Sequence, residues 1–240
     1  MYFRFNNQYR KFDMTKKIRV LIFGIIALNI HVFSQNTIDS FKCGDTITDT
    51  RNGKTYPTLL IGEQCWMAKN LNVGIVVSDF NQLDNGIIEK TCYDNDPENC
   101  RIYGGLYTWH EAMNWETEDQ GICPAGWYLP SREDWEKLVL ELGKEDAGQH
   151  MKVTKEHNPP WDGTNSSGFT ALPAGVGYKS HYGRIGHWAL FWSSTQVDMD
   201  YAWFAQLDNF WYPAPPKYKK LYIGDHFVKE NGFSVRCVRR

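Results

Sequence analysis

The fold is decided by the stretch ICPAGWYLPSREDW at residues 122–135, together with a second stretch, GFSVRCV at residues 232–238. The first stretch ends in the pattern of a helix start, and the second has the pattern of a closing strand. Each stretch carries one cysteine, so a disulfide can join the middle of the chain to its C-terminal part. This arrangement predicts an exported domain whose two halves are tied together.

The N-terminal region has the order of a secretory signal. Basic residues precede an apolar run over residues 20–33, which ends in a small-residue cleavage site. A membrane anchor is the rival interpretation, but the run is shorter than the roughly 20 residues of a spanning helix. Asn29 and His31 also interrupt it. We therefore expect an N-terminal extension and signal peptide over residues 1–34, with no membrane span after cleavage. Residues 35–240 are expected to form one domain that is secreted to the periplasm or the cell surface.

Charge and composition exclude one class of partner. The formal net charge is −2 at pH 7, so the chain lacks the basic footprint of a protein that binds nucleic acid. Aromatic residues make up 15% of the chain and include ten tryptophans. Such a surplus serves either a rigid core or platforms on which a ligand stacks, and we expect the core to take most of it.

Six cysteines in an exported chain indicate a disulfide framework, although six allow fifteen pairings. The spacing favours three bridges whose loops would contribute about 3.4, 2.6 and 4.8 kcal/mol in the chain-entropy treatment. A zinc site is the competing use of clustered cysteines, but the chain has no C-x₂-C pair. In chain order, the expected bridges are Cys43–Cys65, Cys92–Cys100 and Cys123–Cys237.

The expected elements begin with a hairpin, whose strands over residues 46–48 and 56–61 flank the turn Asn52-Gly53. Because Pro57 has no amide hydrogen, its strand is expected at a sheet edge. Trp66 and Met67 follow as expected core residues.

Two helices come next. The first is predicted over residues 105–115 from the spacing of Leu106, Trp109 and Met113. The second is predicted from an N-cap at Ser131 to Gly143. Short strands are expected afterwards, and we assign the chain to the α+β class, with two helices packed on short antiparallel strands and disulfides as staples. The expected strands cover residues 169–172, 188–194, 201–207 and 233–238, with a projecting loop at 211–216.

Six motifs carry a resemblance to a known family. They are GEQCWMAKNL at 62–71, YGGLYTW at 103–109, CPAGWYLPS at 123–131, FTALPAG at 169–175, FWSST at 191–195 and SVRCV at 234–238. In this order they resemble the Fibrobacter succinogenes major paralogous domain, which is abundant in exported Bacteroidetes-type proteins. The resemblance implies a C-type-lectin-like or formylglycine-generating-enzyme-like fold. It implies no particular activity.

Catalysis is not expected from the residues. Enzymes that share the implied fold use a reactive cysteine pair near the C-terminus or a histidine-bound iron, and this chain has only Cys237 there. No nucleophile elbow, phosphate-binding loop or zincin motif occurs. We therefore expect a protein that is not an enzyme.

Structural calcium is the one cofactor considered. Asp94, Asp96 and Glu98 place hard oxygen ligands within a few residues of one another. The alternative is an ordinary turn, because Asn, Asp and Pro are what a short disulfide-closed loop uses in any case.

A binding surface is expected in the C-terminal half, where exposed aromatic rings can stack on sugars or anchor a protein contact. Trp192 and Trp203 are expected in the core instead. We predict a secreted, non-enzymatic recognition domain whose partner is a glycan or a surface protein. The alternatives are a structural or adhesion component of the cell envelope and a divergent enzyme of the formylglycine-generating type. The predicted ligand-binding residues are Tyr178, Tyr182, Trp188, Trp211 and Tyr212.

Overall fold

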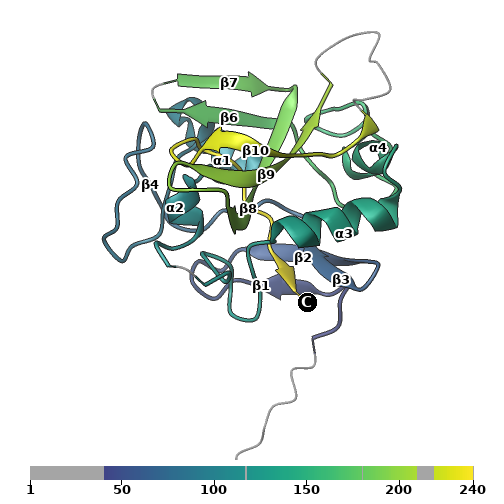
Figure 1. The fold of residues 1–240 in the computed structure, drawn as a ribbon, viewed down its shortest axis with the longest axis horizontal. Coiled ribbons are helices and arrows are strands. Elements are labelled where there is room, and N and C mark those ends of the chain that lie inside the picture. The colour runs from purple at the N-terminus through teal and green to yellow at the C-terminus, as the bar shows by residue number, and fades with distance from the viewer. Residues whose placement is uncertain (1–40, 117, 180, 210–218, 240) are drawn as a thin grey trace, which may run out of the picture. The chain divides into compact units, whose positions relative to one another are not determined.

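A mixed arrangement of curled sheets and short helices forms the described part of the chain (Figure 1). The structure is a computed structural model, and it describes residues 41–116, 118–179, 181–209 and 219–239. The predicted signal region at 1–34 and the predicted loop at 211–216, with Trp211 and Tyr212, lie outside these residues.

The smaller sheet has the strand order β1-β2-β3-β11 and contains the predicted hairpin. Ile47 pairs with Tyr56 across the hairpin. Gly53 closes its turn at φ 71°, a left-handed conformation that suits glycine. The C-terminal strand β11 joins the same sheet because Val238 pairs with Trp66 of β3. The bounds are β1 (Thr46–Thr48), β2 (Thr55–Ile61), β3 (Gln64–Met67) and β11 (Val238–Arg239).

The expectation that Pro57 marks a sheet edge was wrong, because β2 lies between β1 and β3. The backbone polar groups of Pro57 point toward β3, at a position just beyond Met67, the last residue of β3. There its carbonyl accepts a hydrogen bond from the amide of Ala68 at 2.8 Å. No strand residue of β3 lies opposite its missing N–H, so no ladder bond is lost.

The larger sheet has the order β10-β9-β8-β6-β7 and confirms the strands predicted at 188–194 and 201–207. Its pairs are antiparallel except for β6 with β8, which run parallel. A separate short parallel pair joins β4 (Ile75–Val76) to β5 (Glu89–Lys90). The strands of the larger sheet are β6 (Ala174–Tyr178), β7 (His181–Ile185), β8 (Trp188–Gln196), β9 (Tyr201–Asp208) and β10 (Tyr222–Val228).

Helix α3 (Arg132–Leu142) is confirmed with its capping box. Ser131 accepts from the amide of Asp134, whose carboxylate accepts in return from the amide of Ser131 at 2.9 Å. Gly143 ends the helix at φ 88°. Figure 1 shows α3 lying between β2 of the smaller sheet and the strands of the larger sheet. The other helical segments are the 3₁₀ turn η1 (Tyr93–Asn95), α1 (Pro97–Tyr103), α2 (Trp109–Ala112) and α4 (Ala147–Met151).

The predicted helix at 105–115 proved much shorter, because only α2 is helical there. Leu106 and Tyr107 are extended and form bridges with Thr91 and Phe233. Leu106 is buried in an extended segment, whereas Trp109 and Met113 are buried at the single turn of α2. The apolar spacing of the three residues therefore does not come from one face of a longer helix. With η1, α1 and α4 present, the prediction of two helices was also too simple.

Two predicted strands are mostly replaced by isolated bridges. Ala171 bridges Lys152, and the segment at 233–238 pairs in pieces before it enters β11. Phe233 bridges Tyr107, and Ser234 bridges Phe191. The C-terminal segment therefore touches both sheets.

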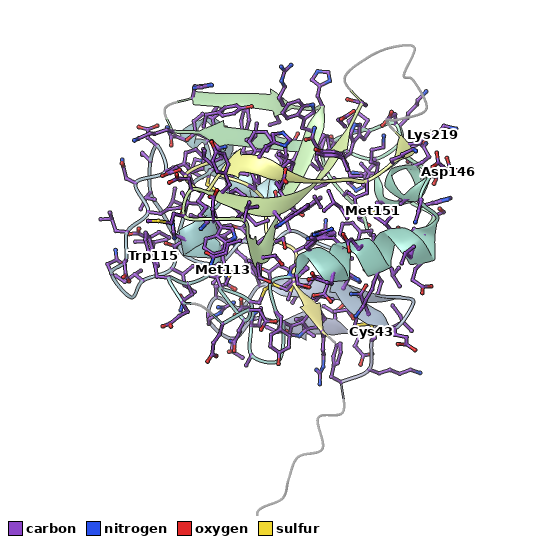
Figure 2. The ribbon with its side chains drawn as sticks, in the orientation of Figure 1. Cys43, Met113, Trp115, Asp146, Met151 and Lys219 are labelled. Atoms are coloured by element: carbon purple, nitrogen blue, oxygen red, sulfur yellow. A yellow bond between two sulfur atoms is a disulfide. The ribbon has the colours of Figure 1, made fainter. Side chains whose placement is uncertain are left out.

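The core lies on both faces of the larger sheet. Alternate residues of β8 supply the two sides: Leu190 and Trp192 pack in one cluster, and Phe191 packs in the other. Trp66 and Trp192 are fully buried, as predicted. Met151 of α4 is buried in the second cluster (Figure 2).

The prediction that Trp203 belongs to the core was wrong. It is half-buried, because it alternates with Ala202 and Phe204, which point to the first cluster. The guanidinium of Arg132, at the start of α3, lies 4.1 Å from the centre of its ring. Trp203 therefore packs beneath a surface cation.

The three predicted disulfides are confirmed and use all six cysteines. Their Cα–Cα distances are 5.8 Å for Cys43–Cys65, 5.0 Å for Cys92–Cys100 and 5.9 Å for Cys123–Cys237. Such a framework is typical of proteins that fold in an oxidising compartment. Within the described ranges, no helix is long and apolar enough to cross a membrane.

Candidate functional site

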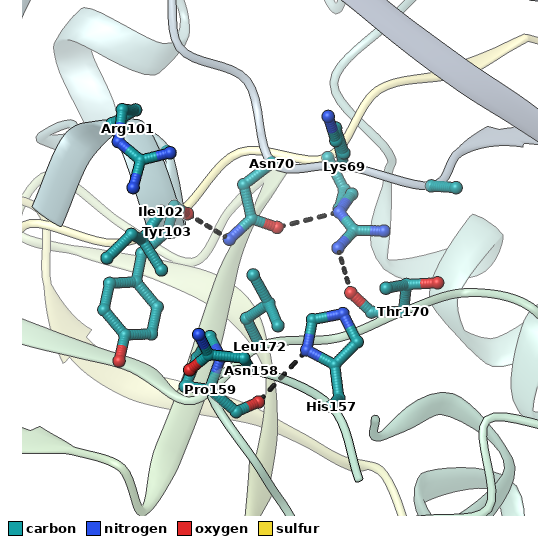
Figure 3. Close-up of a pocket in the computed structure, with 13 residues that line it drawn as sticks. Lys69, Asn70, Arg101, Ile102, Tyr103, His157, Asn158, Pro159, Thr170 and Leu172 are labelled. Atoms are coloured by element: carbon teal, nitrogen blue, oxygen red, sulfur yellow. Dashed lines mark hydrogen bonds between the residues drawn. The ribbon is translucent and has the colours of Figure 1, made fainter. Parts of the chain in front are cut away.

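A cavity of about 440 Å³ lies where four segments distant in the sequence meet (Figure 3). The segments are residues 68–70 after β3, the C-terminal turn of α1, the turn at 157–159 and residues 170–172. Arg236 completes the lining. The volume falls in the range of small-ligand sites.

Asn70 ties these walls together. Its amide nitrogen donates to the carbonyl of Tyr103 at 2.8 Å and to the hydroxyl of Ser234 at 3.1 Å. Its amide oxygen accepts from Nε of Arg236 at 2.8 Å. Gly104 lets α1 approach this closely, because a Cβ there would lie 2.7 Å from Cβ of Asn70.

Arg236 is a buried cation without a counter-ion among the described residues. Besides the bond to Asn70, it donates to the carbonyls of Met67, Phe169 and Thr170. Its guanidinium carbon lies 4.4 Å from the centre of the Phe169 ring. Burial lowers the pKa of Arg236 to about 9, so the group remains charged at neutral pH.

The backbone of Thr170 is in a left-handed conformation, with φ 57°, and its carbonyl accepts a hydrogen bond from Arg236. A β-branched residue rarely adopts this region, and such strain costs roughly 1–3 kcal/mol. The side chain of Asn165 holds the conformation by accepting from the Thr170 amide at 2.8 Å. The wall of the cavity is therefore fixed in place.

Several polar side chains around the cavity are not used by the fold. The Lys69 ammonium, the Tyr103 hydroxyl and the Asn158 amide have no hydrogen-bond or ion-pair partner among the described residues. His157 donates from Nδ1 to the carbonyl of Pro159 at 3.1 Å, which leaves Nε2 available. Figure 3 shows these groups around Leu172.

The charge of the lining is one-sided. None of the described residues that line the cavity is an Asp or a Glu, whereas Lys69, Arg101 and Arg236 are cations. Arg101 is already paired with Glu98, through an Nε–Oε2 distance of 2.7 Å. Lys69 and Arg236 therefore supply the positive charge that the protein itself does not neutralise here.

The three predicted calcium ligands have other roles. Asp96 caps α1 by accepting from the amide of Glu98 at 2.9 Å. Glu98 pairs with Arg101, and Asp94 lies in the left-handed conformation of a turn at φ 54°. In the described ranges, no three His, Cys, Asp or Glu side chains are grouped so that they could hold a metal ion. The carboxylates of Asp96 and Glu98 are thus used within α1, and Asp94 has the backbone conformation of a turn.

The predicted aromatic residues that the structure describes lie near β6 and β7. Tyr178 stacks on His181 with ring centres 4.6 Å apart. Tyr182 donates its hydroxyl to the side chain of Asn95 at 2.8 Å. Trp188 lies beneath the guanidinium of Arg184, 4.9 Å from ring centre to cation. None of these residues lines the cavity around Arg236. All three are partly buried: Tyr178 and Trp188 pack against the first core cluster, and Tyr182 packs against a small third cluster.

Sequence reasoning missed the cavity. Lys69, Asn70, Tyr103 and Arg236 all lie within the quoted motifs, but no site was predicted from them, and only Arg236 falls in a predicted element, the strand at 233–238. The signal that could have found the site is a lone charged residue, Arg236, inside the mostly apolar closing strand at 233–238. A buried cation in that position needs acceptors, and those acceptors come from several segments.

The comparisons concern the whole described domain. No curated protein and no solved structure matches the chain. The family model of the Fibrobacter succinogenes major domain matches residues 59–239. This range includes the larger sheet, α3 and every residue that lines the cavity, whereas β1 and the first residues of β2 precede it. The chain therefore belongs to the Fibrobacter succinogenes major domain family.

Proposed function

We propose that this chain is an exported, non-enzymatic recognition domain of C-type-lectin-like fold that binds a glycan or surface protein in the periplasm or at the cell surface. The observation that carries the proposal is the cavity, in which side chains free of internal partners surround a pre-formed pocket. Such convergence of polar groups on fixed walls is the usual mark of a binding site. The pairing of β11 with β3, beside the N-terminal hairpin, supports the lectin-like fold.

A thiol-based enzyme of the formylglycine-generating type is disfavoured. Its chemistry would require a free cysteine pair, but Cys123 and Cys237 are joined in a disulfide. A reactive pair would therefore have to break the bridge that ties the two halves of the domain together.

A structural or adhesion role is the second candidate. The segment from β4 to β5 exposes Ile75 at 53%, Leu83 at 60% and Ile87 at 53% of their surface. Exposed apolar side chains close together in the chain can join neighbouring subunits of an assembly. Self-association on a sizing column, lost in Leu83→Ser, would favour this role.

Binding of the mature, oxidised domain to glycan and surface-protein arrays, with and without calcium, tests the proposal. We expect a specific signal that Tyr103→Ala abolishes. Tyr222→Ala is the matched control, because Tyr222 is exposed on β10 and does not line the cavity.

Three other results would redirect the proposal. Loss of the signal in Trp188→Ala but not in Tyr103→Ala would move the site to the predicted aromatic surface. A blank array from a well-folded sample would favour the structural role. A signal that requires calcium would support the predicted calcium site at Asp94, Asp96 and Glu98.

A further inference from the structure

We propose that the cavity around Arg236 recognises the carboxylate of an acidic sugar residue, such as a uronate within a glycan. This inference rests on the proposed function and names the class of ligand for the same site. It follows from the charge of the lining, the unused donors and the polar character of the walls.

The charge argument starts from Arg236 and Lys69. A guanidinium has five N–H groups, and Arg236 uses four of them in bonds to Asn70, Met67, Phe169 and Thr170. One N–H on Nη2 has no partner among the described residues. All four acceptors are uncharged, so the buried charge itself is left without compensation, which is costly. An anionic ligand group would supply the missing counter-charge.

Lys69 provides the second half of the anion site. It is exposed, lines the same cavity and has no ion-pair partner in the described ranges. Arg101 and Glu98 neutralise each other at the rim, and no carboxylate of the described residues lines the cavity. An approaching anion therefore meets two cations and no repelling group.

The remaining groups favour a sugar as the carrier of the carboxylate. The Tyr103 hydroxyl, the Asn158 amide and Nε2 of His157 offer donors and acceptors at separate positions around the cavity. A sugar ring presents hydroxyls in several directions, each of which can donate and accept. The half-exposed ring of Tyr103 also offers a flat face against which a sugar can pack.

Calorimetric titration with two probes tests the inference. The probes are a galacturonate trisaccharide and the same trisaccharide with its carboxylates methyl-esterified. We expect the free acid to bind at least about tenfold more tightly, with an affinity that falls as salt is raised. Lys69→Gln should weaken binding of the free acid about tenfold and leave binding of the ester unchanged.

Lys137→Gln is the matched control, because Lys137 is an exposed lysine of α3 that does not line the cavity. Equal binding of acid and ester, with no effect of Lys69→Gln, would overturn the inference and leave the proposed function intact. No binding of any glycan or surface protein on the arrays would overturn both. Binding of a short peptide with a free C-terminal carboxylate, but of no acidic sugar, would overturn the sugar assignment.

Discussion

Replacing Arg236 with lysine should destabilise the domain although the charge is kept. The guanidinium reaches four acceptors in different directions: the Asn70 side chain and the carbonyls of Met67, Phe169 and Thr170. A single ammonium can satisfy one or two of them from one position. At least two buried acceptors then lose their partner, at roughly 1–3 kcal/mol each.

The expected loss is therefore about 4 kcal/mol, a large share of the roughly 5–15 kcal/mol that stabilises an ordinary domain. For a domain of this size it corresponds to a fall in Tm of roughly 10 °C. Urea unfolding of the oxidised protein, followed by tryptophan fluorescence, measures the free energy directly. Calorimetry gives the matching Tm.

Arg132→Lys is the control for this experiment. Arg132 pairs with Glu136 on the exposed face of α3 at 2.7 Å, so its replacement should cost less than about 1 kcal/mol. If Arg236→Lys is as stable as Arg132→Lys, the fork-shaped hydrogen bonding of Arg236 does not hold the cavity walls, and the reasoning fails.

Three further predictions concern bonds elsewhere in the domain. Cys123→Ser/Cys237→Ser should lower the free energy of unfolding by about 5 kcal/mol, since that bridge spans 114 residues; an unchanged urea midpoint would refute its structural role. Burial and neighbouring Lys54 lower the pKa of Lys90 from 10.5 to about 8. Between pH 8 and pH 10 the unfolded chain therefore holds a proton that the folded one has lost, and stability should rise by about 2 kcal/mol. Lys90→Gln should flatten this rise in urea titrations; a rise of the same size in the variant would contradict it. Ser131→Ala should cost about 1 kcal/mol by thermal unfolding, through loss of the α3 cap, and no change would mean that Asp134 alone suffices.

Elements that are determined by residues close together in the chain were predicted correctly. The capping box at Ser131, the turn at Asn52-Gly53 and the alternating strands β8 and β9 all depend on residues that are close in sequence. The disulfide pairing was also correct, because one long and two short loops suited the positions of the cysteines.

The errors occurred where distant segments decide the outcome. Leu106 has helical spacing with Trp109 and Met113, but it lies with Tyr107 in an extended segment, because Thr91 and Phe233 pair with these two residues. Pro57 is tolerated in an internal strand only because β3 ends before the position opposite it. Periodicity in one segment contains no information about either partner.

The candidate site could not be predicted for the same reason. Lys69 and Tyr103 come from the first half of the domain, whereas His157 and Arg236 come from the second. Each residue alone has an ordinary explanation as a surface or core group. Only the three-dimensional arrangement shows that they surround one cavity whose charge is uncompensated.

The segment at 232–239 determines when the domain can complete its folding. Gly232 pairs with Gly177, Phe233 with Tyr107 and Val238 with Trp66, so this late segment joins parts of the domain that are otherwise far apart in the chain. Until it has been synthesised, neither the long disulfide nor the Arg236 network can form. A chain without this segment remains incompletely folded, so folding of the domain is completed only by its last strand. A truncation before residue 232 should therefore be degraded by proteases as an incompletely folded polypeptide.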